Sequence, residues 1–297
     1  MPAFPVPSSL RGVWHLVRDT VEGFIDDDAL SRGASIAYYT LFSLAPILLI
    51  VVALAGLAFG RDAARGALVD QLSGLMGGKS AEALQAMIES ASDPKTGMTA
   101  SLIGILAALI TLTGAFGEVQ SALNAIWKAK SRRSTLSRLM RARLASLGLV
   151  VTSGFLLTVS LVVSAALAAL SNYLKAVFPA GEFALQLADI VISGTLLTGM
   201  FAAIYKVLPD TPIAWRDVAI GALVTTGLFE GGKYVIALYI GKSNVASSYG
   251  AAGALIILLL WIFYSAQIFL LGAEFTRAFA RRYGTHVGRE VSNPTPS

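Results

Sequence analysis

Long apolar runs separated by shorter polar segments dominate the pattern along this chain of 297 residues. Each run is long enough to cross the hydrocarbon core of a membrane as a helix, which takes about 20 residues. The pattern therefore predicts an all-α, polytopic membrane protein, a bundle of about six transmembrane helices. The predicted spans are 34–59, 98–117, 144–170, 184–208, 218–240 and 250–275.

Two segments outside these spans predict helices of another kind. Between residues 8 and 30, apolar residues recur at helical spacing, with Arg11 and Glu22 among the polar positions. We expect an amphipathic helix here that either lies in the lipid headgroup region or packs on the bundle. Residues 61–97 are too polar to span and predict an external helical loop. The predicted organisation is a cytoplasmic tail with the amphipathic helix (1–33), a six-span domain (34–283) and a disordered cytoplasmic tail (284–297).

The distribution of Lys and Arg predicts the orientation in the membrane, because cytoplasmic loops carry an excess of positive charge. Placing both termini in the cytoplasm leaves 16 basic residues inside, 6 outside and Lys233 within a span. No apolar signal-peptide core precedes the first span, so we expect that span to act as its own insertion signal.

Composition agrees with a membrane protein. Hydrophobic residues make up 55% of the chain and charged residues only 14%, whereas soluble domains are about 25% charged. The net charge of +5 is concentrated in the basic segment 128–143. The positive-inside rule alone is enough to explain this segment. Anionic lipid headgroups would also be attracted there, by about 1 kcal/mol per basic residue, and RNA is a third alternative.

The fifth predicted span contains a pair of opposite charges, Glu230 and Lys233. A lone charge at this depth is unfavourable by about 2.5–3.5 kcal/mol, but residues three apart on a helix can pair. The pair is either a substrate, ion or proton site, or a neutral structural pair that sets the register of the bundle. A helical projection places it on one arc with small and polar residues, expected to face other helices or a cavity: Thr226, Gly227, Gly231, Tyr234 and Ala237. Within this arc, Gly227 and Gly231 have the spacing that permits close helix packing.

Neighbouring spans add polar residues that could complete a path. In the sixth span, Tyr264 and Gln267 share one stripe, with Gln267 expected to face the interior, whereas Glu274 is expected in a solvated ion pair beside Arg277. In the first span, Pro46 predicts a kink and a role in helix packing, and nearby hydroxyls can satisfy the carbonyls that it frees. The predicted substrate or ion path comprises Glu230, Lys233, Tyr234, Thr226, Gln267, Tyr264 and Tyr39.

The chain lacks the residues that several enzyme classes need. It has no cysteine, which excludes disulfides, thiolate metal sites and a cysteine nucleophile. Its two histidines, His15 and His286, lie one in each tail without a carboxylate cluster, whereas metal-assisted phosphodiester cleavage needs such a cluster. Gly241-Lys242-Ser243 lacks the upstream glycine of a nucleotide-binding loop. We therefore expect no catalytic residues, no metal, no cofactor and no nucleic-acid partner.

Several separated motifs resemble the YihY/BrkB family of bacterial inner-membrane proteins over residues 20–283. They are Ser43-Leu44-Ala45-Pro46, Leu208-Pro209-Asp210, Leu228-Phe229-Glu230-Gly231-Gly232-Lys233, Ala237-Leu238-Tyr239-Ile240, Tyr249-Gly250, Trp261 and Leu271-Gly272-Ala273-Glu274. The resemblance implies a multi-pass protein of the inner membrane, with a lipid translocase or solute transporter as the expected function. The alternative is a non-transporting membrane scaffold, and a ribonuclease, which an older family label suggests, comes third. Membrane lipids are the expected partners, and a homo-oligomer is left open.

Overall fold

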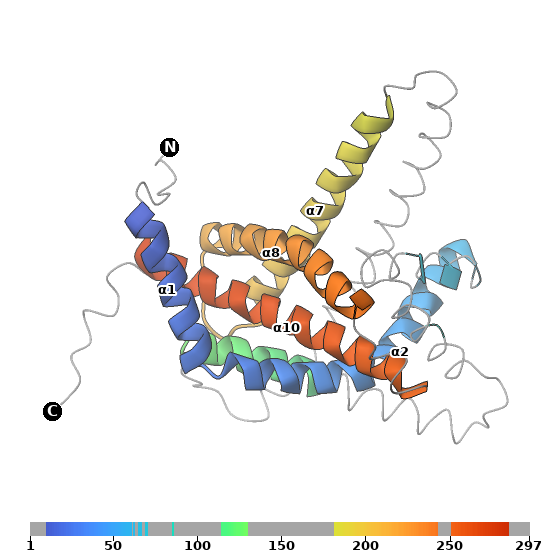
Figure 1. The fold of residues 1–297 in the computed structure, drawn as a ribbon, viewed down its shortest axis with the longest axis horizontal. Helices are drawn as coiled ribbons and strands as arrows, with labels where there is room; N and C mark the ends of the chain where they lie inside the picture. Colours follow the sequence, from blue (N-terminus) through green and yellow to red (C-terminus); the bar gives the residue numbers. More distant parts are fainter. Residues whose placement is uncertain are drawn as a thin grey trace.

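The computed structural model of the protein describes residues 10–60, 114–129, 181–242 and 251–284, with a few single positions between residues 62 and 85. Every regular element in these residues is an α-helix (Figure 1). The elements are α1 (Leu10–Asp26), α2 (Ala29–Phe59), helix 114–126, α7 (Gly181–Val207), α8 (Trp215–Lys242) and α10 (Ala251–Arg282).

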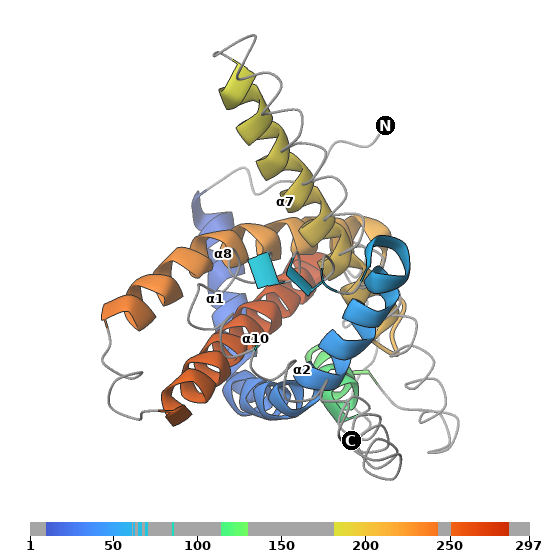
Figure 2. The same cartoon turned by 90° about the vertical axis from the view of Figure 1, so that its right-hand side faces the viewer.

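Helix α10 is the centre of the described bundle. It packs against α8, α2 and α1, while α7 packs against α8. Figures 1 and 2 show α10 between α8 on one side and α2 on the other. The N-terminal half of α7 extends away from these helices, and its Ile190 and Val191 are exposed. The central position of α10 means that polar groups on α10 meet several neighbours at once.

Helices lie at four of the predicted spans, with differences at their ends. Spans 34–59, 184–208, 218–240 and 250–275 correspond to α2, α7, α8 and α10. The second span was predicted to end at residue 117, but helix 114–126 continues across that boundary. Polar side chains beyond residue 117 form hydrogen bonds with the turn between α7 and α8. Gln120 Nε2, for example, donates to the Leu208 carbonyl oxygen at 3.2 Å. The described residues do not include 98–113, 130–180 or most of 61–97. They also leave out the parts of the two predicted tails that precede α1 and follow residue 284.

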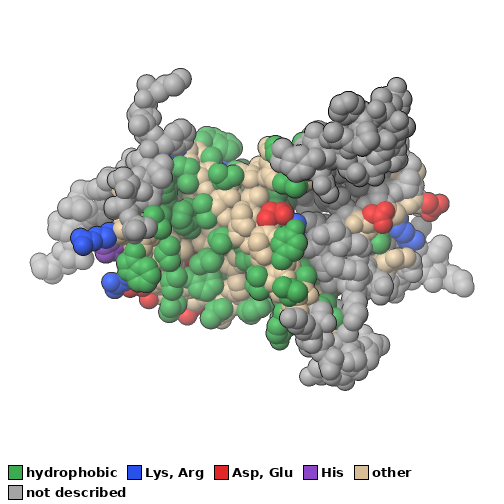
Figure 3. All heavy atoms as spheres, turned by 45° about the horizontal axis from the view of Figure 1, so that its top comes forward, with side chains coloured by type: hydrophobic (Ala, Val, Ile, Leu, Met, Phe, Trp, Pro, Cys, Tyr) green, Lys and Arg blue, Asp and Glu red, His purple; other side chains and the backbone are tan. Residues whose placement is uncertain are grey.

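Two of the described helices are long and apolar enough to cross a membrane, over Ile190–Val207 and Leu255–Arg282. Hydrophobic side chains also cover much of the described surface in Figure 3. Helix α2 remains helical through Pro46 and changes direction along its length (Figures 1 and 2). A proline inside a helix removes one backbone hydrogen bond, and such positions commonly bend helices.

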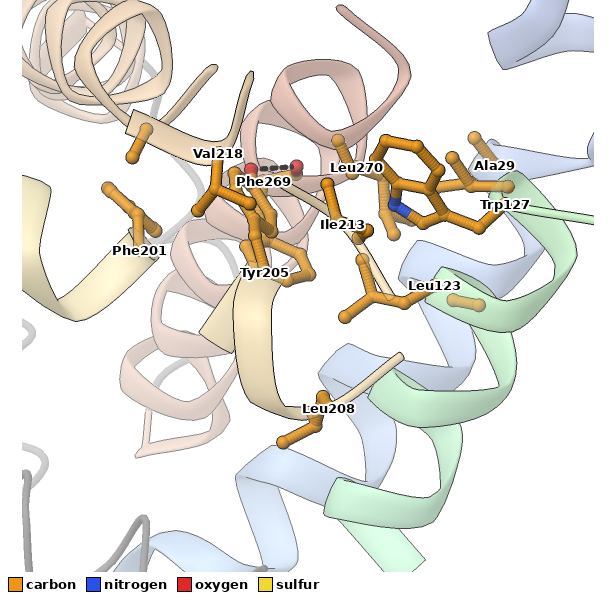
Figure 4. Packing of buried hydrophobic residues seen from close by; sticks show 14 of the residues in the cluster. Ala29, Leu123, Trp127, Phe201, Tyr205, Leu208, Ile213, Val218, Phe269 and Leu270 are labelled. Carbon is orange, nitrogen blue, oxygen red and sulfur yellow. Dashed lines mark hydrogen bonds between the residues drawn. The ribbon is translucent and has the colours of Figure 1, made fainter. Parts of the chain in front are cut away.

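Aromatic residues fill the core between α7, α8 and α10. Tyr205 is fully buried, and its ring centroid lies 5.1 Å from that of Phe269 and 6.4 Å from that of Phe201. The Tyr205 hydroxyl donates to the Phe269 carbonyl oxygen at 2.7 Å (Figure 4). Its oxygen also lies 3.1 Å from the hydroxyl of Thr225 on α8. One side chain therefore joins three helices and satisfies its own buried polar atom.

Helix α1 packs against the C-terminal part of α10. Leu16 is buried in a small cluster with Ala278 and Phe279 of α10. On the other side of α1, Trp14 and Ile25 are exposed. The helix therefore packs on the bundle and also presents apolar side chains outward.

Candidate functional site

The two charges of the fifth predicted span lie on α8 and form an ion pair. Lys233 Nζ is 2.8 Å from Glu230 Oε2, and the Glu230 and Lys233 side chains are 42% and 20% exposed. Both charges therefore remain partly accessible.

The face of α8 that packs against other helices differs from the predicted one. Val218, Ala222 and Ile236 are buried, and Phe229 packs against the core. Tyr234, which was predicted to face the interior, is 70% exposed. The prediction placed the charges toward the bundle, but burial of the apolar side chains orients the helix instead.

The glycine of α8 that packs closely against another helix is also not one of the two predicted. Among the described residues, no atom lies within 4 Å of a Cβ added at Gly227 or Gly231. A Cβ added at Gly232 would lie 2.6 Å from Cδ1 of Ile268 on α10. The described close approach is thus made through Gly232, and the pair predicted to pack, Gly227 and Gly231, faces away from α10.

The remaining predicted path residues contact different neighbours. Thr226 is buried, and its hydroxyl oxygen lies 2.9 Å from that of Thr198 on α7. Tyr264 lies beside Gly232, because its hydroxyl would be 2.9 Å from a Cβ added there. Gln267 donates to the Leu30 carbonyl oxygen at 3.3 Å.

Tyr39 contacts a different helix from the other predicted path residues. Its ring lies against Gly114 of helix 114–126, where an added Cβ would be 2.6 Å from the ring atom Cδ1. The described structure therefore does not gather the seven predicted residues around one cavity. Glu230 and Lys233 do contact each other directly.

A charged pocket of about 530 Å³ lies where α1 meets α10. Sequence reasoning did not identify it. Its lining comes from α1, from the turn that follows α1, from the turn after helix 114–126 and from the C-terminal part of α10: Asp19, Glu22, Gly23, Asp26, Asp27, Lys128, Glu274, Arg277, Ala278, Arg281 and Arg282.

Asp27 joins the elements around this pocket. Its side chain is only 5% exposed. Lys128 Nζ bonds to Asp27 Oδ1, and Arg277 Nη1 donates to Asp27 Oδ2 at 3.1 Å. Arg32 Nε donates to the Asp27 backbone carbonyl at 2.8 Å. Because Lys128 is 101 and Arg277 is 250 residues away in sequence, no local spacing could have revealed this cluster.

Glu274 lies in the same pocket and is only 2% exposed on its side chain. Its Oε2 is 3.6 Å from Arg277 Nη1, and its Oε1 is buried without a hydrogen-bond partner among the described residues. The predicted ion pair with Arg277 is therefore present, but the prediction that it is solvated is wrong. The reason is that α1 covers this end of α10, with Gly23 so close that an added Cβ would be 2.6 Å from Glu274 Oε2.

More exposed ion pairs surround the pocket. Arg282 Nη2 donates to Asp19 Oδ2 at 2.6 Å and ties α10 to α1. On α1 itself, Arg18 Nε donates to Glu22 Oε1 at 2.6 Å. That hydrogen bond, with the charge of Glu22, raises the pKa of the Arg18 guanidinium. Exposed pairs of this kind contribute little to stability. The two pairs therefore position side chains at the edge of the pocket and add little to the stability of the fold.

Helix 114–126 is fixed to the turn between α7 and α8, which places Lys128 at the pocket. Asn124 Nδ2 donates to Asp210 Oδ2 at 2.9 Å, and the Asp210 backbone N–H donates to Asn124 Oδ1 at 2.8 Å. Lys128 lies in the turn after the helix and has a φ of 48°. The Leu208-Pro209-Asp210 motif therefore holds this helix in place.

The helical architecture and its apolar helices, together with relatives known as membrane proteins, define a helical membrane protein. The chain belongs to the BrkB family, since the family model described as "Virulence factor BrkB" matches residues 20–294. A UPF0761 membrane protein of Pseudoalteromonas translucida is 31% identical over 254 residues, which cover 85% of this chain and 81% of the relative.

Two further UPF0761 membrane proteins are similar over most of this chain. That of Ralstonia nicotianae is 32% identical over 251 residues, covering 83% of this chain and 55% of the relative. That of Alkalilimnicola ehrlichii is 27% identical over 270 residues, covering 87% and 57%. The chain thus spans a little over half the length of these two relatives. No solved structure matches the chain.

Proposed function

We propose that this protein is a multi-pass protein of the bacterial inner membrane, with six spans and both termini in the cytoplasm, and that it translocates a lipid-like substrate. The excess of basic residues on the predicted cytoplasmic side, 16 against 6, supports the orientation. The four described helices that match predicted spans support the helical bundle.

The open face of α8 carries the proposal of translocation. Glu230 is 42% exposed, and no described residue covers the glycines on either side of it, Gly227 and Gly231. A pair that only fixed helix register would be expected between two helices with both side chains buried. Here both side chains remain partly exposed instead, so that a polar group can reach them.

The surroundings of the pair favour an amphipathic substrate over a fully polar one. Leu223, Tyr234 and Leu238 are exposed on the side of α8 that carries Glu230. A polar headgroup could exchange contacts with Glu230 and Lys233 while its apolar part stays against these side chains. A hydrophilic solute would need an enclosed polar channel, whereas apolar groups surround this ion pair.

Membrane lipid is also the partner that we propose for the basic segment 128–143, through anionic headgroups. We propose neither an enzymatic activity nor a nucleic-acid partner. The scarcity of histidine and the absence of cysteine support this part of the proposal.

The test is translocation of a dye-labelled phospholipid in proteoliposomes, read as the fraction protected from a membrane-impermeant reductant. Glu230→Gln and Lys233→Met are made singly and together, with Tyr239→Phe, an exposed α8 position, as the control. Each single change leaves one unpaired charge, worth about 2.5–3.5 kcal/mol in a membrane, and should lower the folded yield. The double variant should recover the yield but not translocation.

Recovery of both yield and translocation in the double variant would refute the proposed path and leave a neutral structural pair. A wild-type protein that translocates no labelled lipid would refute the proposed function. Loss of translocation in Tyr239→Phe would show that the assay reports a general disturbance of α8 and would remove support for the pair.

A further inference from the structure

Helix α1 carries an apolar stripe of five exposed side chains along one side. They are Val13, Trp14, Val17, Val21 and Ile25, each between 43% and 68% exposed. Their spacing along the helix places all five within about a third of its circumference, since successive residues turn by about 100°. A continuous row of exposed apolar side chains indicates a surface that binds something apolar.

The stripe is separate from the side of α1 that packs on the bundle. On that side Leu16 and Thr20 are buried, and Gly23 lies close to α10. A third side holds exposed polar residues, among them His15 and Glu22. The middles of the three sides are about a third of a turn apart. The contact of α1 with α10 therefore does not use the apolar stripe.

The connection to α2 places the end of α1 close to the membrane. Helix α2 begins at Ala29, five residues before the predicted start of the first span at residue 34. A helix rises about 1.5 Å per residue, so the end of α1 lies about 8 Å from the predicted edge of the hydrocarbon core. The headgroup region of one leaflet is about 5–8 Å thick. Since α1 also crosses α10 instead of continuing in line with α2 (Figure 1), we place α1 at the level of the headgroups.

Lipid fits the apolar stripe better than a second protein chain does. A stable protein–protein interface buries about 800 Å² on each partner, from about 20–30 residues, whereas the stripe has five. Attraction by anionic headgroups contributes little, because α1 holds two basic residues and three acidic ones. Insertion of apolar side chains between headgroups and acyl chains needs neither a large partner nor a positive charge. Tryptophan, represented here by Trp14, is enriched at this level of membranes.

We propose that α1 is an in-plane membrane anchor. Its apolar stripe inserts into the boundary between headgroups and acyl chains of the cytoplasmic leaflet, while the side that carries Leu16 stays packed on α10. The two positions that the sequence offers for this helix, in the headgroup region or on the bundle, are then occupied together by different sides. Because Arg282 of α10 is bonded to Asp19 of α1, the anchor also holds the C-terminal end of α10 at a fixed depth. The inference rests on the membrane location and orientation proposed above, but not on translocation.

The test places a nitroxide spin label on the full-length protein in phosphatidylcholine nanodiscs. The chain has no cysteine, so Val17→Cys and Val21→Cys each introduce one label on the stripe. His15→Cys, on the polar side of the same helix, is the matched control. All three positions are exposed, so the label does not disturb buried packing. Collision rates with oxygen, which concentrates in the bilayer, and with a water-soluble nickel complex report the depth of each label.

We expect the ratio of oxygen to nickel collisions to be several-fold higher for Val17→Cys and Val21→Cys than for His15→Cys. The result should be the same when phosphatidylglycerol is added to the nanodiscs, because the attraction is apolar. A ratio for the two stripe variants that equals that of His15→Cys would overturn the anchor.

Two other outcomes would also overturn it. Shielding of the stripe only after phosphatidylglycerol is added would mean that charge, and not the apolar stripe, holds α1 at the membrane. Dipolar broadening between Val17→Cys labels in proteoliposomes, where chains can meet, would mean that a second copy covers the stripe. None of these measurements uses lipid translocation, so a failure of the anchor is distinguishable from a failure of the proposed function.

Discussion

Three consecutive aspartates at the end of α1 have three different environments. Asp26 is exposed, whereas Asp27 is buried between Lys128 and Arg277. Asp28 has a φ of 52°, the left-handed conformation that makes the turn into α2. A short polar side chain tolerates that conformation better than a branched one. The sequence indicates only a polar break at this point, and the packing of α10 decides which aspartate is buried.

Glycines on α8 provide a test of which face of this helix is packed. A Cβ added at Gly221 would lie 2.7 Å from Cβ of Thr276 on α10, whereas one added at Gly227 meets no described atom within 4 Å. Gly221→Ala should therefore destabilise the protein by about 1–3 kcal/mol through overpacking. Gly227→Ala should be neutral or stabilising by up to about 1 kcal/mol, because alanine favours the helix. Thermal unfolding in detergent compares the two variants.

These two variants also distinguish the sequence-based orientation of α8 from the structural one. If Gly227 made the close helix contact that its spacing with Gly231 suggests, Gly227→Ala would be the destabilising change. A loss of stability in Gly227→Ala with none in Gly221→Ala would contradict the described packing of α8 on α10.

Among the elements, helix 114–126 shows how polar residues extend a helix beyond its predicted end. Gln120 and Asn124 lie after the predicted end of the second span, yet both donate to the turn between α7 and α8. Lys206, at the end of α7, bonds to the Ile213 carbonyl within the same turn. The turn is therefore bonded both to helix 114–126 and to the end of α7. Helix 114–126 is in turn anchored by these hydrogen bonds and by its buried Leu123 and Ile126.

An exchange of the two side chains at this junction tests the anchoring. Asn124→Asp replaces the donor that faces Asp210 Oδ2 with a second carboxylate, so it should destabilise the protein by about 1–3 kcal/mol. Adding Asp210→Asn should restore stability, because the amide introduced by that change can donate to the new carboxylate, which still accepts from the backbone N–H of residue 210. The thermal midpoints of wild type, both single variants and the exchange give the coupling.

A different result would point to a different anchor. If the exchange variant is as unstable as Asn124→Asp alone, the Asn124–Asp210 contact does not hold helix 114–126. The apolar contacts of Leu123 and Ile126 would then be sufficient.

For the whole molecule, the distribution of Lys and Arg makes a prediction about orientation that labelling can check. The chain has no cysteine, so single cysteines report position without background. In intact spheroplasts, Ser134→Cys and Ser292→Cys should be shielded from an impermeant thiol reagent, and Ser80→Cys should react. Permeabilised cells supply the control, since all three should then react. Labelling of Ser134→Cys from outside would contradict the proposed orientation.

The sequence by itself determined the membrane character, the helical class and the approximate limits of α2, α7, α8 and α10. These properties depend on local apolar content and length, which a helix displays without reference to its neighbours. The tertiary structure decided which face of α8 packs, why Glu274 is buried and why Asp27, Lys128 and Arg277 meet. Helical periodicity places residues on an arc but does not say which arc a neighbour covers. Partners 101 and 250 residues apart come together only through the packing of α1 and helix 114–126 around α10.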